Sequence, residues 1–124
     1  MTTRWIGSGF VIAACGLMLA GAACGADQVS PAAQEEAQNI FKARCTMCHG
    51  AVALAAGMAL NPRPRNWTDP AWQKATPDAE IEKAIVGVGQ AVGKSVLMPA
   101  NPDLKDKPEV VKALLGIVRG FAAK

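Results

Sequence analysis

The residues best suited to chemistry stand together in the segment Cys45-Thr46-Met47-Cys48-His49. Two cysteines separated by two residues and followed at once by a histidine form the attachment signal of a c-type haem. At the end of a helix, thiols three residues apart point the same way, so each can form a thioether with one vinyl group of the porphyrin. The segment therefore predicts one covalent haem c, held by Cys45 and Cys48, with His49 as an axial iron ligand.

Three other uses of these residues fit the rest of the sequence less well. A structural zinc site needs four ligands, but the chain has a single histidine, and its other cysteines, Cys15 and Cys24, lie in an apolar N-terminal segment. A thioredoxin-like redox pair belongs near a βαβ pattern, of which the sequence gives no sign. A disulfide between Cys45 and Cys48 would close too short a loop to stabilise the fold much.

A second iron ligand is expected from a methionine, because the only histidine is already used. Met47 lies inside the attachment segment and cannot reach the opposite face of the haem. Met58 follows soon after His49, in a loop that must first leave the histidine side. Met98 comes much later and precedes Pro99, which stiffens its loop. We therefore predict Met98 as the second axial ligand, although methionines more often only fill gaps in a core.

A stretch rich in proline and arginine covers residues 61–72 and contains Arg63, Arg65, Trp67 and Trp72. By composition it could be an ordinary solvated loop. Guanidinium and indole N–H groups are, however, the donors that a buried carboxylate needs. We expect at least one of these four side chains to contact the haem or its propionates.

Residues 1–26 have the pattern of an export leader rather than of a folded segment. Arg4 is followed by an uncharged, mostly apolar run that closes on small residues, which is the plan of a bacterial secretory signal. Cleavage would release a soluble domain, whereas lipidation at Cys24 or an uncleaved anchor would tether it to the membrane. In each case residues 27–124 would form one domain in the periplasm, where haem c is attached.

Length and composition fit one small domain built around a cofactor. The chain has 124 residues and a net charge of +3, which is too mild a balance to predict nucleic acid as a partner. It contains three Trp, three Phe and no Tyr, so side chains large enough to fill a core are scarce. A domain of this size then needs an internal staple, and a haem would supply one.

Three helices are predicted to position these residues. The first begins at Ser30-Pro31, a cap followed by a proline, and ends near Cys45. The second begins in the same way at Thr76-Pro77. The third begins at Asp106, which forms a capping-box pattern with Glu109. Apolar residues recur at helical spacing in all three.

The remaining segments predict no further regular element apart from one helical turn at Asp69-Pro70. No strand alternation is present, so the predicted class is all-α. Segments 51–69 and 87–102 would be long loops for so small a domain. They become reasonable if a cofactor fills the space that they enclose.

The arrangement resembles a class I cytochrome c, the small mono-haem type of the bacterial periplasm. The likeness covers most of residues 33–121 and rests on the helix that runs into Cys45–His49, on the late Met98-Pro99-Ala100 and on a C-terminal helix. It implies three to four short helices wrapped around one haem, with the first and last helices crossing at one haem edge.

Aromatic residues of the family's helices are matched only in part. Phe41 corresponds to the aromatic of the family's first helix. Where the family often has an aromatic in the middle of the last helix, this chain has Ile117 or Val118. We expect this departure to change the contact at the helix crossing.

A haem whose axial positions are both filled, by His49 and Met98, has no vacancy for oxygen, peroxide or substrate. It can still gain or lose one electron, and the thioether sulfur raises the potential. The sequence therefore predicts a one-electron carrier, not an enzyme, that docks transiently on redox partner proteins at the exposed haem edge. Two alternatives stay open: a labile sixth position for gas binding or weak peroxidase activity, and a haem subunit docked on a larger oxidoreductase.

Overall fold

The computed structural model describes residues 28–52, 62–87 and 97–123, and these residues are helical, with no strand among them. The all-α class is thereby confirmed for this part of the chain. The elements, in order, are α1 (Pro31–Ile40), a π-helix (Phe41–Cys45), α2 (Thr46–His49), α3 (Pro70–Ala75), α4 (Asp78–Val86), a 3-10 turn (Pro102–Leu104), α5 (Pro108–Arg119) and a 3-10 end (Gly120–Ala123). No described helix is both long and apolar enough to cross a bilayer. The leader at 1–26 and Met58 lie outside the described residues.

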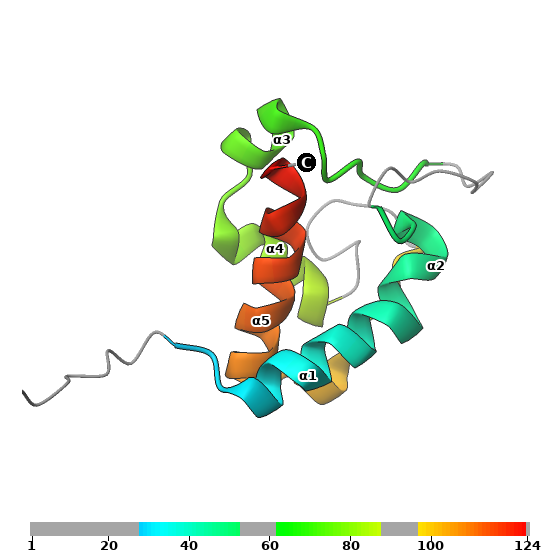
Figure 1. Ribbon diagram of the computed structural model, residues 1–124. Coiled ribbons are helices and arrows are strands. Elements are labelled where there is room, and N and C mark those ends of the chain that lie inside the picture. The colour runs from blue at the N-terminus through cyan, green and yellow to red at the C-terminus, as the bar shows by residue number, and fades with distance from the viewer. Residues whose placement is uncertain (1–27, 53–61, 88–96, 124) are drawn as a thin grey trace, which may run out of the picture.

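The first and last helices pack against each other, with α1 running across the foot of α5 in Figure 1. Small and aliphatic side chains fill their contact, and we call this set the aliphatic junction: Ala33, Ala37, Ile40, Leu104, Val110, Val111, Ala113 and Leu114. Ala37 and Leu104 are completely buried. Alanine on the inner face of α1 lets the two backbones approach closely, so part of the alanine content of the chain serves helix packing.

A second cluster lies further along α5 and is built from larger side chains. We call it the aromatic cluster: Trp67, Ile81, Leu115, Val118 and Phe121, with the half-buried Phe41 packed against it. The rings of Phe41 and Phe121 lie 5.9 Å apart between centroids, and Trp67 lies 6.2 Å from Phe41 and 6.1 Å from Phe121. Phe121, just beyond α5, is therefore the residue near the C-terminus whose ring packs on Phe41.

Two of the predicted helix starts are confirmed. The hydroxyl oxygen of Ser30 accepts the Ala33 N–H at 3.3 Å and caps α1. The carboxylate of Asp69 accepts the Ala71 N–H at 2.9 Å and caps α3, which runs for more than the single predicted turn. In both cases a proline occupies the first helical position, where its missing N–H is not needed.

The predicted capping box of α5 is wrong. The helix begins at Pro108, with Lys107 as its cap residue and no side-chain capping bond. A proline disfavours helical backbone in the residue before it, so Lys107 cannot continue a helix from Asp106. The Glu109 carboxylate instead accepts a hydrogen bond of 2.8 Å from the Ser30 hydroxyl.

The start of α4 is shifted by one residue from the prediction. Pro77 is the cap residue, without a side-chain bond, and Asp78 is the first helical residue. Thr76 does not cap α4, because Pro77 is itself in extended backbone (ψ 149°) and so takes the cap position in its place. The Thr76 N–H donates to the Trp72 carbonyl and closes the end of α3.

Candidate functional site

One uninterrupted helical path carries all three residues of the predicted attachment motif. The first helix was expected to end near Cys45, but helical backbone continues to His49. Between α1 and α2 the backbone widens into a π-helix, in which the Thr46 N–H donates to the Phe41 carbonyl five residues earlier. The path ends at Gly50, whose φ of 77° suits glycine. Single π-turns within helices are frequent at functional sites.

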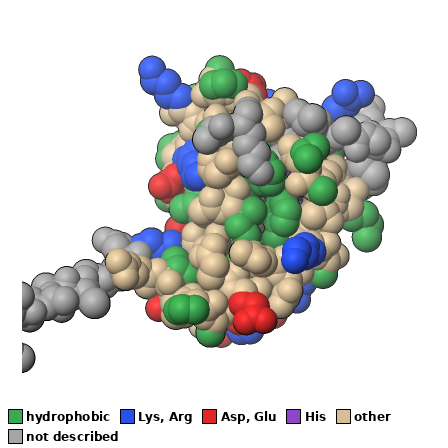
Figure 2. Space-filling view, in the orientation of Figure 1, with side chains coloured by type: hydrophobic (Ala, Val, Ile, Leu, Met, Phe, Trp, Pro, Cys, Tyr) green, Lys and Arg blue, Asp and Glu red, His purple; other side chains and the backbone are tan. Residues whose placement is uncertain are grey.

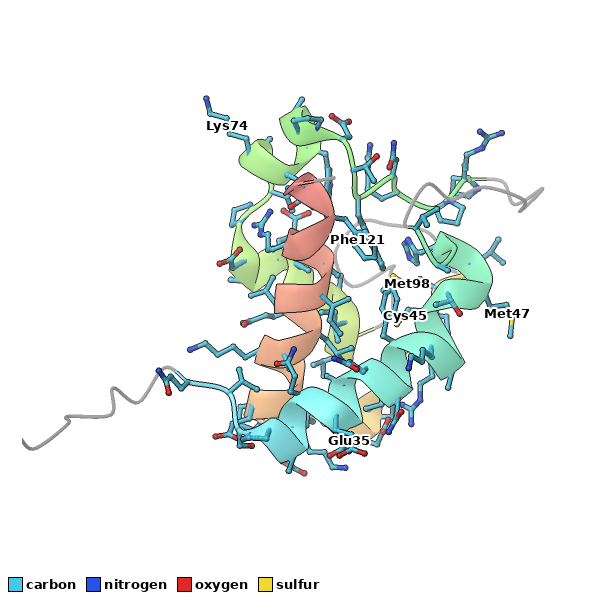
Figure 3. All side chains as sticks on the ribbon, viewed as in Figure 1. Glu35, Cys45, Met47, Lys74, Met98 and Phe121 are labelled. Carbon is cyan, nitrogen blue, oxygen red and sulfur yellow. The ribbon has the colours of Figure 1, made fainter. Side chains whose placement is uncertain are left out.

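The two cysteines of the motif are free thiols and are half-buried. Cys45 packs against the aromatic cluster, and burial raises its thiol pKa, although the Arg44 guanidinium opposes this. A raised pKa keeps the thiol protonated at neutral pH. Met47, between the cysteines, is 71% exposed and points away from Cys45 in Figure 3. The motif thus has a cysteine on its inner face and an exposed methionine on its outer face.

A hydrogen bond and a ring contact of His49 both come from one short segment. Its Nδ1 lies 3.3 Å from the Arg65 carbonyl oxygen. Its ring stacks on the Trp67 indole, with 3.9 Å between centroids and 16° between planes. A carbonyl can only accept a hydrogen bond, so we assign the imidazole proton to Nδ1, which leaves the lone pair of Nε2 available.

The protonation state of His49 suits metal binding. Burial lowers the pKa of the imidazole, and the hydrogen bond to the Arg65 carbonyl only partly opposes this effect. The ring is therefore neutral at pH 7, and neutral imidazole is the form that binds metals. Among the described residues, no three His, Cys, Asp or Glu side chains gather closely enough to bind a metal ion by themselves.

Met98 is half-buried and lies in a segment that is fixed at two places. The Asn101 amide Nδ2 donates to the Ile85 carbonyl at 2.7 Å, and its backbone N–H donates to the Val86 carbonyl at 3.0 Å. The segment is therefore held on the end of α4, shortly after Met98.

Arg44 fixes the same segment to the helix that carries the motif. Its guanidinium donates to the Asn101 side-chain oxygen at 3.1 Å and to both carboxylate oxygens of Asp103 at 2.9 Å. This hydrogen bond lowers the pKa of Asp103. Because Arg44 immediately precedes Cys45, the Met98 segment and the first cysteine are linked through one side chain. In Figure 3, Met98, Cys45 and Phe121 project into the same central region of the view.

Apolar side chains are visible in that region on the molecular surface. Figure 2, in the same orientation, shows hydrophobic side chains gathered in the middle of the face, between the positions of α2 and α5 in Figure 1. An apolar surface beside two thiols and an imidazole is what a porphyrin ring needs for burial.

The four candidates of the 61–72 stretch are divided between surface and core. Arg63 and Arg65 are exposed, Trp72 is half-buried against the aromatic cluster, and Trp67 is buried within it. Their contacts with propionates remain predictions. Arg65 does contribute to the site, but through its backbone carbonyl rather than through the guanidinium that drew attention to it. Every residue has a carbonyl, so no residue type in the sequence could have identified this contact.

Comparisons of the chain with protein-family models, with curated proteins and with solved structures found no match. Function is therefore inferred from the residues and their geometry alone.

Proposed function

We propose that the protein carries one covalently bound haem c and transfers single electrons, as class I cytochromes c do. His49 gives the strongest support, because it follows Cys48 directly and donates its Nδ1–H toward a backbone carbonyl. Metal-ligating histidines nearly always donate their other ring N–H in this way, which fixes the tautomer and makes the ligating nitrogen more basic. No catalytic role explains this geometry equally well, since the neutral ring has no acidic or nucleophilic partner among its described contacts.

Four residues would hold the haem. Cys45 and Cys48 would form the two thioethers, and His49 and Met98 would provide the axial ligands. When bound, the haem iron supplies reversible uptake of one electron, at a potential raised by a thioether ligand and by apolar surroundings. The aromatic cluster would exclude water from one edge of the site, and Arg44 would hold the Met98 segment against the motif.

The absence of a second histidine favours a carrier over a peroxidase. His49 is the only imidazole in the chain, so none remains for acid–base work on peroxide once it binds iron. The alternative of a larger assembly, with this chain as a docked haem subunit, uses the same site and the same ligands. We place the domain in the periplasm, exported by residues 1–26.

Expression with a haem-attachment system in a bacterial periplasm tests the proposal. The intact mass should show one added haem and also reveal leader cleavage or a lipid on Cys24. The ferric protein should have a low-spin spectrum with a sulfur-to-iron band. That band should vanish in Met98→Ala and persist in Met47→Ala, which removes the exposed methionine. A wild-type protein without covalent haem, or one that is high-spin when ferric, would overturn the proposal.

A further inference from the structure

Gln73 is a buried polar residue whose hydrogen bonds join three parts of the molecule. Its side chain in α3 is 8% exposed. The amide nitrogen donates to the Trp67 carbonyl at 2.7 Å and to the Val118 carbonyl at 2.9 Å. The amide oxygen accepts from the Arg119 guanidinium at 2.9 Å. Both amide protons are thus used, and a fully satisfied buried amide specifies one arrangement of its partners.

Arg119 fixes Gln73 through several hydrogen bonds. One guanidinium nitrogen also donates to the Gln73 backbone carbonyl at 2.6 Å, and another donates to the Thr76 carbonyl at 2.6 Å. The Arg119 Nε donates to the Asp78 carboxylate at 2.8 Å. The two carbonyls are at the end of α3, where helices leave such groups without intrahelical partners. The end of α3 is therefore locked to the end of α5.

The hydrogen bond of Gln73 to the Trp67 carbonyl connects this network to His49. The indole of Trp67 stacks on the imidazole, and the Arg65 carbonyl, two residues earlier, faces the imidazole Nδ1. Segment 65–67 therefore sets both the plane of the ring and its hydrogen bond. The Trp67 indole is itself buried in the aromatic cluster, and Gln73 adds a side-chain hydrogen bond that ties the backbone of this segment to the core.

We infer that Gln73 is a positioning residue for the His49 imidazole and acts through the Trp67 backbone. The inference rests on the proposed function, because it concerns His49 as an iron ligand. A firm Nδ1–H bond to the Arg65 carbonyl makes the imidazole a stronger donor. A stronger donor stabilises the more highly charged ferric state, so Gln73 helps to set the reduction potential without contacting the haem.

The test compares the reduction potential of haem-loaded wild type with that of Gln73→Met, a variant of similar length that lacks both donors. We expect haem to remain attached and the potential to rise. The electron-exchange equilibrium with a reference dye should change by up to about tenfold, because mutation of a direct partner of a ligating histidine changes metal affinity or activity by about 10–100-fold and Gln73 acts one step further away. The ferric proton NMR spectrum should show a changed pattern of haem-methyl shifts, since that pattern follows the orientation of the imidazole plane.

Ser30→Ala is the matched control, because it removes the α1 cap and the bond to Glu109 at the far end of α1. It should lower stability without moving the potential or the NMR pattern. Gln73→Glu serves as a second variant if Gln73→Met does not fold, since its carboxylate accepts from Arg119 but does not donate to the two carbonyls. It is judged by the NMR pattern, because its added charge moves the potential by itself. An unchanged potential and NMR pattern in a folded Gln73 variant would overturn the inference while leaving the proposed function intact. A wild type without haem would overturn both.

Discussion

The aliphatic junction and the aromatic cluster share helix α5 but are built in different ways. The junction joins mainly two helices through small side chains, and the polar links Lys107–Glu36 and Ser30–Glu109 lie at its exposed rim. The aromatic cluster draws rings from separate segments, and the buried amide of Gln73 donates to the backbone carbonyls of two of its members, Trp67 and Val118.

The difference indicates that the aliphatic junction stabilises the fold, whereas the aromatic cluster also borders the proposed haem site. Small side chains let the backbones of two helices pack closely, which suits an interface that only stabilises the fold. Large rings leave room at their edges and can pack against a flat group, and one of them stacks on the residue that we propose as an iron ligand. Variants of the junction should therefore change stability alone, whereas variants near the aromatic cluster should also change the haem.

The largest effect is expected from removing both thiols, in Cys45→Ala combined with Cys48→Ala. Without covalent haem the domain has too few large side chains for a stable core, so cooperative thermal unfolding by circular dichroism should disappear. The single variant Cys45→Ala keeps one attachment point and should retain part of the transition. Cooperative unfolding of the double variant at wild-type temperature would refute the idea that haem completes the core.

Leu104→Ala should cost about 2–5 kcal/mol of unfolding free energy, because it leaves a cavity at a completely buried position of the junction. Denaturant titration of the haem-loaded protein measures this loss, and the visible spectrum should stay unchanged. Val52→Ala, at an exposed position, should change stability by less than about 0.5 kcal/mol. A spectral change in Leu104→Ala would show that junction and site are coupled.

Phe121→Leu should cost about 1 kcal/mol through loss of its ring contacts. Unlike Leu104→Ala, it should also shift the reduction potential, since Phe121 packs on the Trp67 ring that stacks on His49. Voltammetry and denaturant titration of the same sample separate the two effects. A loss of stability without a shift of the reduction potential would show that the aromatic cluster, like the aliphatic junction, affects stability alone.

Arg44→Met should have the smallest effect on folding, because its ion pair with Asp103 is exposed. It should instead loosen the Met98 segment, so added imidazole should displace the methionine faster in stopped-flow absorbance. Lys107→Met breaks a similar exposed pair at the junction and should leave this rate unchanged. Equal rates in the two variants would contradict a role for Arg44 at Met98.

The ion pair of Arg44 with Asp103 also predicts that the rate of methionine displacement depends on pH. Arg44 lowers the pKa of Asp103 in the folded protein. The ion pair therefore holds the Met98 segment fully at any pH above the ordinary pKa of an aspartate. Its contribution decreases as the pH falls through the lowered value. With rates expressed per concentration of neutral imidazole, wild type should therefore approach the displacement rate of Arg44→Met only in acid. Arg44→Met itself should show a flatter pH profile over that range.

Sequence rules worked where one short segment decides the outcome. Ser30 and Asp69 cap their helices as predicted, because cap and following proline are adjacent in the chain. The cysteines and the histidine of the motif are recognisable for the same reason. At Thr76 the same rules failed because the next residue, Pro77, is itself extended and becomes the cap. At Asp106 they failed because Pro108, two residues later, keeps Lys107 out of the helix.

The parts of the site that escaped prediction depend on tertiary contacts. Three contacts bring together residues that are distant in sequence. They are the hydrogen bond of His49 to the Arg65 carbonyl, the ion pair of Arg44 with Asp103, and the hydrogen bond of the Gln73 amide to the Val118 carbonyl. Two of these contacts use backbone oxygens, which no residue type reveals. The axial role of Met98 and the propionate contacts of Arg63, Arg65, Trp67 and Trp72 remain predictions.

The packing of α1 on α5 also has a consequence for timing during the proposed export. A chain exported with its N-terminal leader first brings Cys45 and Cys48 into the periplasm before Pro108–Arg119, which bury the inner face of α1. Contacts between such distant segments form only after a long loop has closed. Until then no packed core surrounds the thiols, so export itself provides an interval in which a haem-attaching enzyme of the periplasm can reach them.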